Sequence, residues 1–175
     1  MEQTALYRKT FTGQVMKSEK KRVLIVSGAP GSGKTHYVKA HLQPGDIALD
    51  FDYLTAALAL DDRLYGDREP QLHVALAARE AIFETIAKRE GGWNTAYIIT
   101  ARKEPARVQE LADRLGAEVI HMSATLEECQ ENIRNDSRRT DRTELYCRLA
   151  EEWFQQNETV TVQVKSKSCT SQIQV

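Results

Sequence analysis

The segment from Val23 to Thr35, VLIVSGAPGSGKT, places a run of branched apolar residues directly before a glycine-rich turn. A continuous apolar run of this length is typical of a strand that is buried on both faces, as in a parallel sheet. The residues after the turn predict a helix from Gly33 or Lys34 to about Leu42, because Pro44 and Gly45 follow and would break it. The segment therefore predicts an α/β fold built on a parallel sheet.

Segments of strand and helix character alternate along the rest of the chain. Further strands are expected at 46–52, 95–100, 118–122 and 159–164, and further helices at 71–89, 105–115, 125–135 and 142–156. This order predicts a three-layer α/β sandwich with about five parallel strands, right-handed crossovers and helices on both faces. In such a sheet, ligands bind at the carboxyl ends of the strands.

The overall composition fits one domain. With 175 residues, of which 41% are hydrophobic and 28% charged, the chain is long enough for one core and short for two. We expect an N-terminal extension at 1–20, a domain at 21–165 and a C-terminal tail at 166–175 whose composition is typical of disorder.

Charge, cysteines and hydropathy indicate where such a chain works. The net charge of −1 offers no general attraction for nucleic acid or anionic membranes. The 3 cysteines have no metal-binding spacing and indicate free thiols in a reducing compartment. No apolar run approaches the roughly 18 residues of a membrane span. We expect a soluble, cytoplasmic protein without membrane contact.

Residues 28–35, GAPGSGKT, match the pattern G-x-x-x-x-G-K-[ST] in full. In this pattern, backbone N–H groups of the turn surround a phosphate, the lysine contacts the β- and γ-phosphates, and the final hydroxyl binds Mg²⁺. The helix that follows directs its positive end toward the same anion. We therefore expect ATP and Mg²⁺ to be bound by Gly28, Ala29, Pro30, Gly31, Ser32, Gly33, Lys34 and Thr35.

Two acidic residues follow the second expected strand, in the sequence LDFDY. Asp50 and Asp52, two residues apart on one strand, would point to the same side, toward the phosphate site. A carboxylate there can accept the proton of an attacking hydroxyl, for which we favour Asp52 over Asp50, and Asp50 can join Thr35 at the Mg²⁺ shell. The alternative is that either residue only caps the next helix.

The segment between the last two expected helices, RNDSRRTDR, is rich in arginine. Its arginines are Arg134, Arg138, Arg139 and Arg142. Guanidinium groups suit a lid that closes over a transferring phosphoryl group, because they neutralise charge on its oxygens. The alternative is a solvated charged surface on which these arginines pair locally with Asp136 and Asp141.

Together, GAPGSGKT, LDFDY and ENIRNDSRR resemble the small P-loop kinases. The nearest resemblance is to the kinase domain of phage-type polynucleotide 5′-kinase, followed by zeta-toxin and chloramphenicol phosphotransferase, and it covers roughly residues 21–156. It implies a P-loop NTPase fold, contacts of Lys34 and Thr35 with the phosphates and Mg²⁺, a base at or beside Asp52, and lid roles for Arg134 and Arg138.

Two features depart from the pattern of these kinases. Leu54 and Thr55 stand where the family often has an arginine that holds an acceptor phosphate, and the strand TAYIIT runs into Ala101 and Arg102 without a terminal acid. Motor ATPases use such an acid for Mg²⁺, and no guanine-reading N-K-x-D motif is present either. These features argue against motors, helicases and GTPases and leave the acceptor open.

The sequence thus predicts a kinase that transfers the γ-phosphoryl group of ATP to an acceptor hydroxyl. The acceptor could be a nucleic-acid 5′ end, a nucleotide or a small molecule. The alternative is an ATP-binding or ATP-hydrolysing switch that acts with a protein or nucleic-acid partner. A nucleoside-triphosphate hydrolase that works on nucleic acid is disfavoured by the missing strand-end acid.

Overall fold

A computed structural model describes residues 21–60, 64–65 and 68–168, with side chains up to Asn157 except that of Thr140. The expected N-terminal extension and most of the expected tail lie outside these residues. The strands are β1 (Arg22–Ser27), β2 (Ile47–Leu49), β3 (Thr95–Thr100) and β4 (Glu118–His121). The helices are α1 (Lys34–His41), α2 (Phe51–Ala59), α3 (Glu69–Ala87), α4 (Pro105–Leu115), α5 (Leu126–Arg134), the 3₁₀ helix η2 (Ser137–Arg142) and α6 (Thr143–Ser168).

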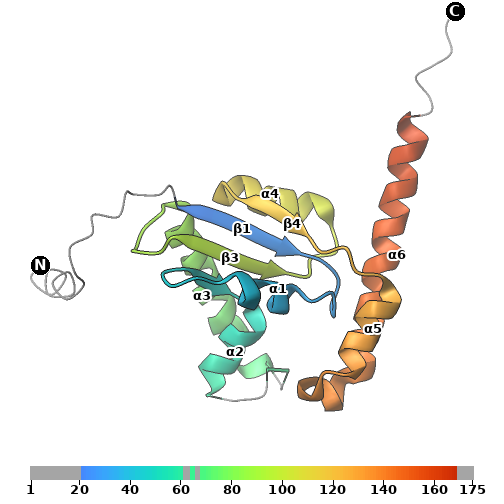
Figure 1. The fold of residues 1–175 in the computed structure, drawn as a ribbon, viewed down its shortest axis with the longest axis horizontal. Helices are drawn as coiled ribbons and strands as arrows, with labels where there is room; N and C mark the ends of the chain where they lie inside the picture. The colour runs from blue at the N-terminus through green and yellow to red at the C-terminus, as the bar shows by residue number, and fades with distance from the viewer. Residues whose placement is uncertain (1–20, 61–63, 66–67, 169–175) are drawn as a thin grey trace, which may run out of the picture.

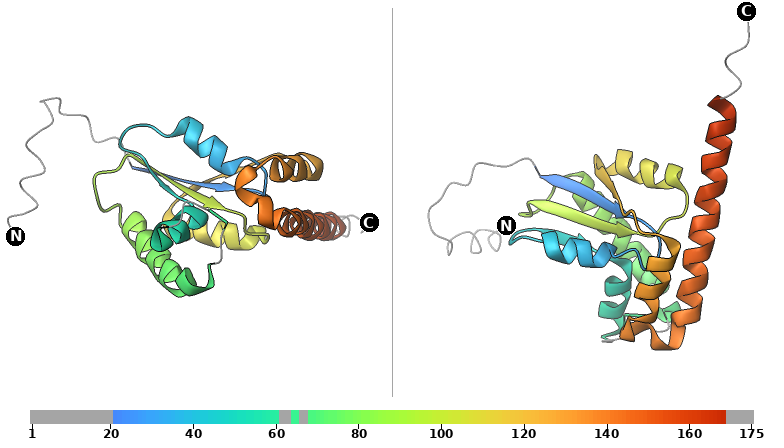
Figure 2. Two further views of the ribbon diagram at one scale, coloured as in Figure 1. Left: turned by 90° about the horizontal axis from the view of Figure 1, so that it is seen from below. Right: turned by 45° about the vertical axis from the view of Figure 1, so that its right-hand side comes forward.

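The four described strands form one parallel sheet in the order β2-β3-β1-β4. Side chains of β1 alternate between its two faces, as the pleat of a strand requires. Val23 and Ile25 pack with α3 and α4 on one face, and Leu24 and Val26 pack with α1 on the other. Figure 2 shows α1 on one side of the sheet and α3 and α4 on the opposite side. The expected three-layer α/β architecture is therefore confirmed.

Helices α5 and α6 pack on each other beyond the carboxyl ends of the strands. In Figure 1 the arrowheads mark these ends and point toward the two helices. Their shared core includes Cys129, Ile133 and Cys147, together with Ala29 of the glycine-rich turn. The two cysteines are free thiols. This packing places one wall of protein directly opposite the strand ends.

The prediction of a strand at 159–164 is wrong, and so is the expected number of about five strands, because this segment was to supply the fifth. These residues belong to α6, which runs on to Ser168 and so also includes the first residues of the expected tail. No glycine or proline interrupts residues 143–168, so nothing in the local sequence ends the helix. The last part of α6 projects away from the sheet in Figure 1.

Candidate active site

The glycine-rich turn between β1 and α1 lies against α5. Gly31 and Gly33 have φ angles of 81° and 84°, in the left-handed region that favours glycine. A Cβ atom on Gly31 would lie 2.3 Å from the carbonyl oxygen of Cys129, so a side chain has no room there. Asn132 Nδ2 donates to the Gly31 carbonyl at 3.0 Å, which also fixes the turn to α5.

Lys34 begins α1 and its ammonium group is buried against the turn. Its Nζ donates to the carbonyl oxygens of Gly28 and Ala29 at 2.9 and 2.6 Å. Burial lowers the pKa of Lys34 to about 8, and the nearby Arg139 charge acts in the same direction. No described side chain caps α1, so the N–H groups of its first turn are available to an anion.

Asp50 links the turn to the start of α2. Strand β2 ends at Leu49, and Asp50 is the N-cap of α2, with Oδ1 accepting from the backbone N–H of Asp52 at 2.9 Å. Its Oδ2 accepts from Thr35 Oγ1 at 3.0 Å. A hydroxyl and a carboxylate beside the glycine-rich turn are oxygen ligands of the kind that Mg²⁺ prefers, so these residues fit the metal. Asp50 therefore caps a helix and also contacts the first turn of α1.

Asp52 lies in the first turn of α2, and the expectation that it shares a strand with Asp50 is wrong. The strand stops early because the Asp50 side chain caps the helix. Asp52 Oδ1 pairs with Arg68 Nη1 at 2.5 Å. Burial raises the pKa of Asp52, while the neighbouring Arg68 charge opposes that change. Arg68 also donates to Tyr146 Oη at 3.3 Å, which joins this pair to α6.

The arginine-rich segment forms η2, whose N-cap is Asp136. The Asp136 carboxylate pairs with Arg138 Nε at 2.7 Å and with Arg139 Nε at 3.0 Å. The Arg139 guanidinium lies over the rings of Tyr65 and Tyr146, at 4.2 and 4.5 Å from their centroids. It also donates to Tyr65 Oη at 2.7 Å, and burial raises the pKa of that phenol to about 12.

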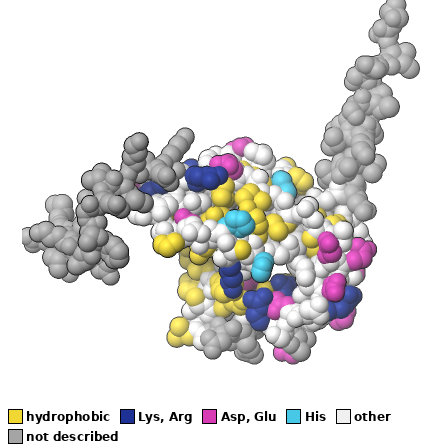
Figure 3. Space-filling view, viewed as in Figure 1, with side chains coloured by type: hydrophobic (Ala, Val, Ile, Leu, Met, Phe, Trp, Pro, Cys, Tyr) yellow, Lys and Arg dark blue, Asp and Glu magenta, His cyan; other side chains and the backbone are white. Residues whose placement is uncertain are grey.

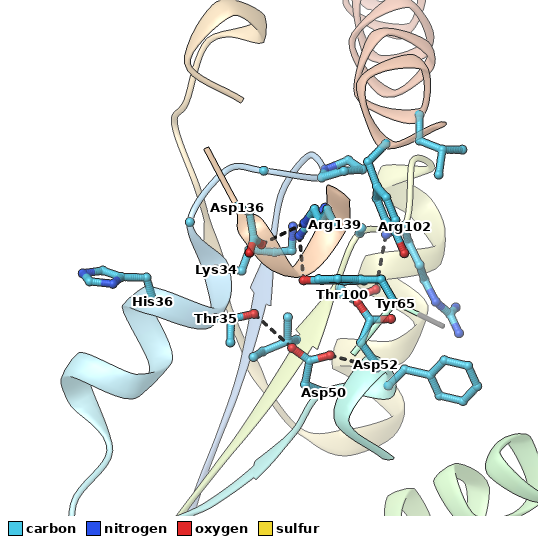
Figure 4. A pocket seen from close by; sticks show the side chains of 18 of the residues that line it. Lys34, Thr35, His36, Asp50, Asp52, Tyr65, Thr100, Arg102, Asp136 and Arg139 are labelled. Atoms are coloured by element: carbon cyan, nitrogen blue, oxygen red, sulfur yellow. Dashed lines mark hydrogen bonds and ion pairs between the residues drawn. The ribbon is translucent and has the colours of Figure 1, made fainter. Parts of the chain in front are cut away.

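These side chains line one cavity of about 1040 Å³. In Figure 4, Lys34 and Thr35 lie on the left and Asp52 and Arg102 on the right, with Arg139 between them. Figure 3 shows basic and acidic side chains gathered around a hollow between the α2 side and the α5 side of the molecule. The predicted site residues that line it are Pro30, Gly31, Gly33, Lys34, Thr35, Asp50, Asp52 and Arg138.

The other predicted site residues lie outside the cavity lining. Gly28, Ala29 and Ser32 are buried members of the turn itself. Arg134 is exposed at the end of α5, where its Nη2 lies 3.4 Å from Gln130 Oε1. The local pairing with Asp136 does occur for Arg138, which nevertheless faces the cavity.

Several cavity residues were not predicted from the sequence. They are Tyr65, Arg68, Arg79, Arg102, Lys103 and Tyr146, among others. Arg139, from the arginine-rich segment expected to form a lid, also lines the cavity, as does its partner Asp136. One signal was present for Arg68, because Pro70 marks the first turn of α3 and so places Arg68 at its N-cap. Tyr65 is a buried aromatic residue within a polar connection, a pattern that favours a structured loop.

Comparisons with known proteins agree with the fold. Residues 23–156 match the AAA domain family. No curated protein matches the sequence. Among solved structures, a chain of the Pnkp1/Rnl/Hen1 RNA repair complex aligns with a TM-score of 0.57 and 11% identity over 85% of this chain. The tunicamycin resistance protein of Deinococcus radiodurans aligns with a TM-score of 0.43 and 25% identity over 67% of this chain and 70% of its own length.

The first of these similarities concerns the fold, and this chain spans 49% of that structure's chain. Among the described helices, none combines the length and apolar character needed to cross a membrane. The matched region begins in β1 and ends in α6, so it includes the glycine-rich turn, both acidic residues and the arginine-rich segment. The expected P-loop fold is confirmed, and the chain belongs to the AAA domain family.

Proposed function

We propose that this protein is an ATP-dependent kinase that transfers the γ-phosphoryl group to an acceptor hydroxyl. The observation that carries the proposal is that a phosphate-binding turn, with Lys34 and Thr35, shares one cavity with a second carboxylate, Asp52. A binding module needs only the turn. A transferase also needs a group that receives the acceptor proton, and Asp52 is available for that task.

The donor side of the cavity is formed by the turn and α1. The N–H groups of the turn and the Lys34 ammonium would hold the β- and γ-phosphates of ATP. Thr35 Oγ1 would hold Mg²⁺, with Asp50 accepting from its bound water, and the ion would neutralise charge on the transferring group. The contact of Thr35 Oγ1 with Asp50 Oδ2 supports this assignment.

The acceptor side is formed by α2 and the start of α3. The Asp52 carboxylate would accept the hydroxyl proton as the new oxygen–phosphorus bond forms and the bond to the ADP oxygen breaks. Burial raises the pKa of Asp52 and so makes the ionised carboxylate a stronger base. The ion pair with Arg68 fixes the orientation of the carboxylate.

The third wall is η2, which carries Arg138 and Arg139. Their guanidinium groups would neutralise charge that develops on the oxygens of the transferring group. Both arginines are held by Asp136 and by the Tyr65 ring, so little reorganisation is needed at the moment of transfer. Arg134 points elsewhere in this structure, which supports Arg138 over Arg134 as a contact to phosphate.

The proposal is tested with γ-labelled ATP, Mg²⁺ and a panel of 5′-hydroxyl oligonucleotides, nucleosides and small alcohols. Lys34→Ala is expected to abolish transfer. Asp52→Asn is expected to lower kcat by about 10²–10⁴-fold, the usual contribution of a general base, while the Kd for ATP changes little. Asp113→Asn, an aspartate of α4 outside the cavity lining, is the matched control.

Two results would overturn parts of this proposal. If no acceptor is labelled and ATP is hydrolysed only slowly, the protein is an ATP-dependent switch or accessory module. If Asp50→Asn loses transfer and Asp52→Asn keeps it, the base is Asp50. The folded fraction of each variant is checked by circular dichroism, because Asp50 is also a helix cap.

A further inference from the structure

Two arginines on the acceptor side of the cavity have charges that no carboxylate of the cavity wall neutralises. Lys34 of the wall donates to two carbonyl oxygens of the glycine-rich turn. Four further basic residues of the wall have close acidic partners: Arg68 pairs with Asp52, Arg138 and Arg139 pair with Asp136, and Lys103 pairs with Glu152. Arg79 and Arg102 differ from them. A cationic wall of this kind is suited to a ligand with a negative charge.

Arg102 stands at the carboxyl end of β3, where a strand-end acid is missing. The register pairs Thr100 with Ser27, so the residues after β3 begin beside the start of the glycine-rich turn. Among the described residues, Arg102 has no ion pair, and its Nη1 only approaches the Arg107 carbonyl oxygen at 3.5 Å. A cation at this edge of the sheet faces the crevice in which α/β proteins bind ligands.

Arg79 extends from α3 over two aromatic rings. Its guanidinium carbon lies 5.3 Å from the ring centroid of Phe51 and 5.8 Å from that of Phe83. Its Nε is buried and has no hydrogen-bond partner. Among the residues that the structure describes, the carboxylate that pairs with Arg79 is Glu80, at 3.4 Å, and Arg114 binds Glu80 more closely, at 2.8 Å.

The geometry of Arg79 leaves donors for a ligand. When aromatic rings cover the faces of a guanidinium, its N–H groups point outward in its own plane. Such a fork matches the oxygens of a phosphate or a carboxylate. Arg79 and Asp52 line the same cavity, and the Phe51 ring under the guanidinium belongs to the first turn of α2, as Asp52 does.

We propose that the acceptor carries an anionic group, a phosphate or a carboxylate, which Arg79 and Arg102 bind while its hydroxyl faces Asp52. This inference rests on the proposed kinase function and adds the class of its substrate. It also accounts for the absence of an arginine at positions 54 and 55, because cations from α3 and from the end of β3 supply the charge instead.

The test uses acceptor pairs that differ by one anionic group, namely a nucleoside and its 3′-monophosphate, glycerol and glycerol 3-phosphate, and glyceramide and glycerate. A 5′-hydroxyl oligonucleotide is added to separate a nucleic-acid phosphate from a small-molecule phosphate. Transfer is expected to favour the anionic member of at least one pair by tenfold or more in kcat/KM. Arg102→Gln and Arg79→Gln are expected to raise KM for that member at least tenfold, with KM for ATP unchanged.

Arg107→Gln is the control, because this exposed arginine of α4 lies outside the cavity lining. The inference is overturned if neutral and anionic members are phosphorylated equally well, or if Arg102→Gln and Arg79→Gln behave like Arg107→Gln. A calorimetric titration of the same pairs, with a non-hydrolysable ATP analogue and Mg²⁺ present, separates the two hypotheses. Selective binding without any transfer would refute the kinase and keep the anion site, whereas no selective binding refutes the anion site.

Discussion

At the scale of single residues, Lys34 has a function that opposes stability. The residue is only 8% exposed, and the lowering of its pKa from 10.5 to about 8 corresponds to a cost of about 3 kcal/mol in the folded state. The charged form is disfavoured on folding, so the cost is fully present below pH 8 and disappears as the pH rises toward 10.5. A residue kept at such a cost is typical of a binding site.

We predict that Lys34→Met stabilises the metal-free and nucleotide-free protein by about 1–3 kcal/mol at pH 7, after allowance for two lost hydrogen bonds. About 2 kcal/mol of the cost has disappeared by pH 9.5, so most of the gain should be lost at that pH. Urea unfolding in the presence of EDTA, at pH 7 and at pH 9.5, measures the change in the free energy of unfolding. Lys39→Met, an exposed lysine of the same helix, should change stability little. A Lys34→Met protein less stable than wild type would contradict the prediction.

The glycines of the turn allow a second prediction at this scale. An alanine side chain at position 31 would clash with the Cys129 carbonyl oxygen and also requires a φ of 81°. An alanine at position 33 requires a φ of 84°, but its Cβ would make only an ordinary van der Waals contact, with Met122 Cε at 4.0 Å. We expect losses of more than about 2 kcal/mol for the first and of about 1–2 kcal/mol for the second. Gly92→Ala, with open space and no positive φ, should be nearly neutral. Equal losses at Gly31 and Gly33 would show that contact with α5 is unimportant.

At the scale of elements, α5 holds the turn in place and depends on its own N-terminus. Thr125 Oγ1 accepts from the Glu128 N–H at 3.2 Å, and Glu128 Oε2 accepts from the Thr125 N–H at 2.8 Å, which completes a capping box. Thr125→Ala should lower the free energy of unfolding by about 1 kcal/mol. Thermal unfolding measures this loss, and Glu131→Ala, on an exposed part of the same helix, serves as control.

The elements also show what sequence patterns could predict. Helix α4 lies where it was predicted, because Pro105 and Gly116 mark its two ends. Strand β3 also has its predicted bounds, because its apolar run is short and polar residues stand on either side of it. The strand predicted at 159–164 was wrong. Alternation of valine and threonine indicates a strand only if a sheet edge is available to pair with the segment, and here the preceding helix continues through these residues instead. Long-range pairs such as Asp52 with Arg68 leave no periodic signal, so the acceptor side of the site was largely missed.

At the scale of the whole molecule, the cavity lies between two units, the sheet with α1 to α4 and the α5–η2–α6 arm. A nucleotide held by both units should stabilise the whole fold. At 100 times its Kd, Mg²⁺·ATP is expected to add about 2.7 kcal/mol to the free energy of unfolding. Differential scanning fluorimetry with ATP should show a rise in Tm that EDTA reduces and Lys34→Met abolishes. No rise at saturating nucleotide would argue against the binding site.

The Arg139 guanidinium contacts Asp136 at the start of η2, Tyr65 between α2 and α3, and Tyr146 on α6. Contacts of one side chain thus join η2, the start of α6 and the connection between α2 and α3, which lies about 70 residues earlier in the sequence. A substitution at only one of these positions would leave a buried charge or an aromatic ring without its partner. Selection can therefore accept such substitutions only in combination. Among relatives of this protein, positions 65, 139 and 146 are therefore expected to covary, which an alignment of homologous sequences would measure.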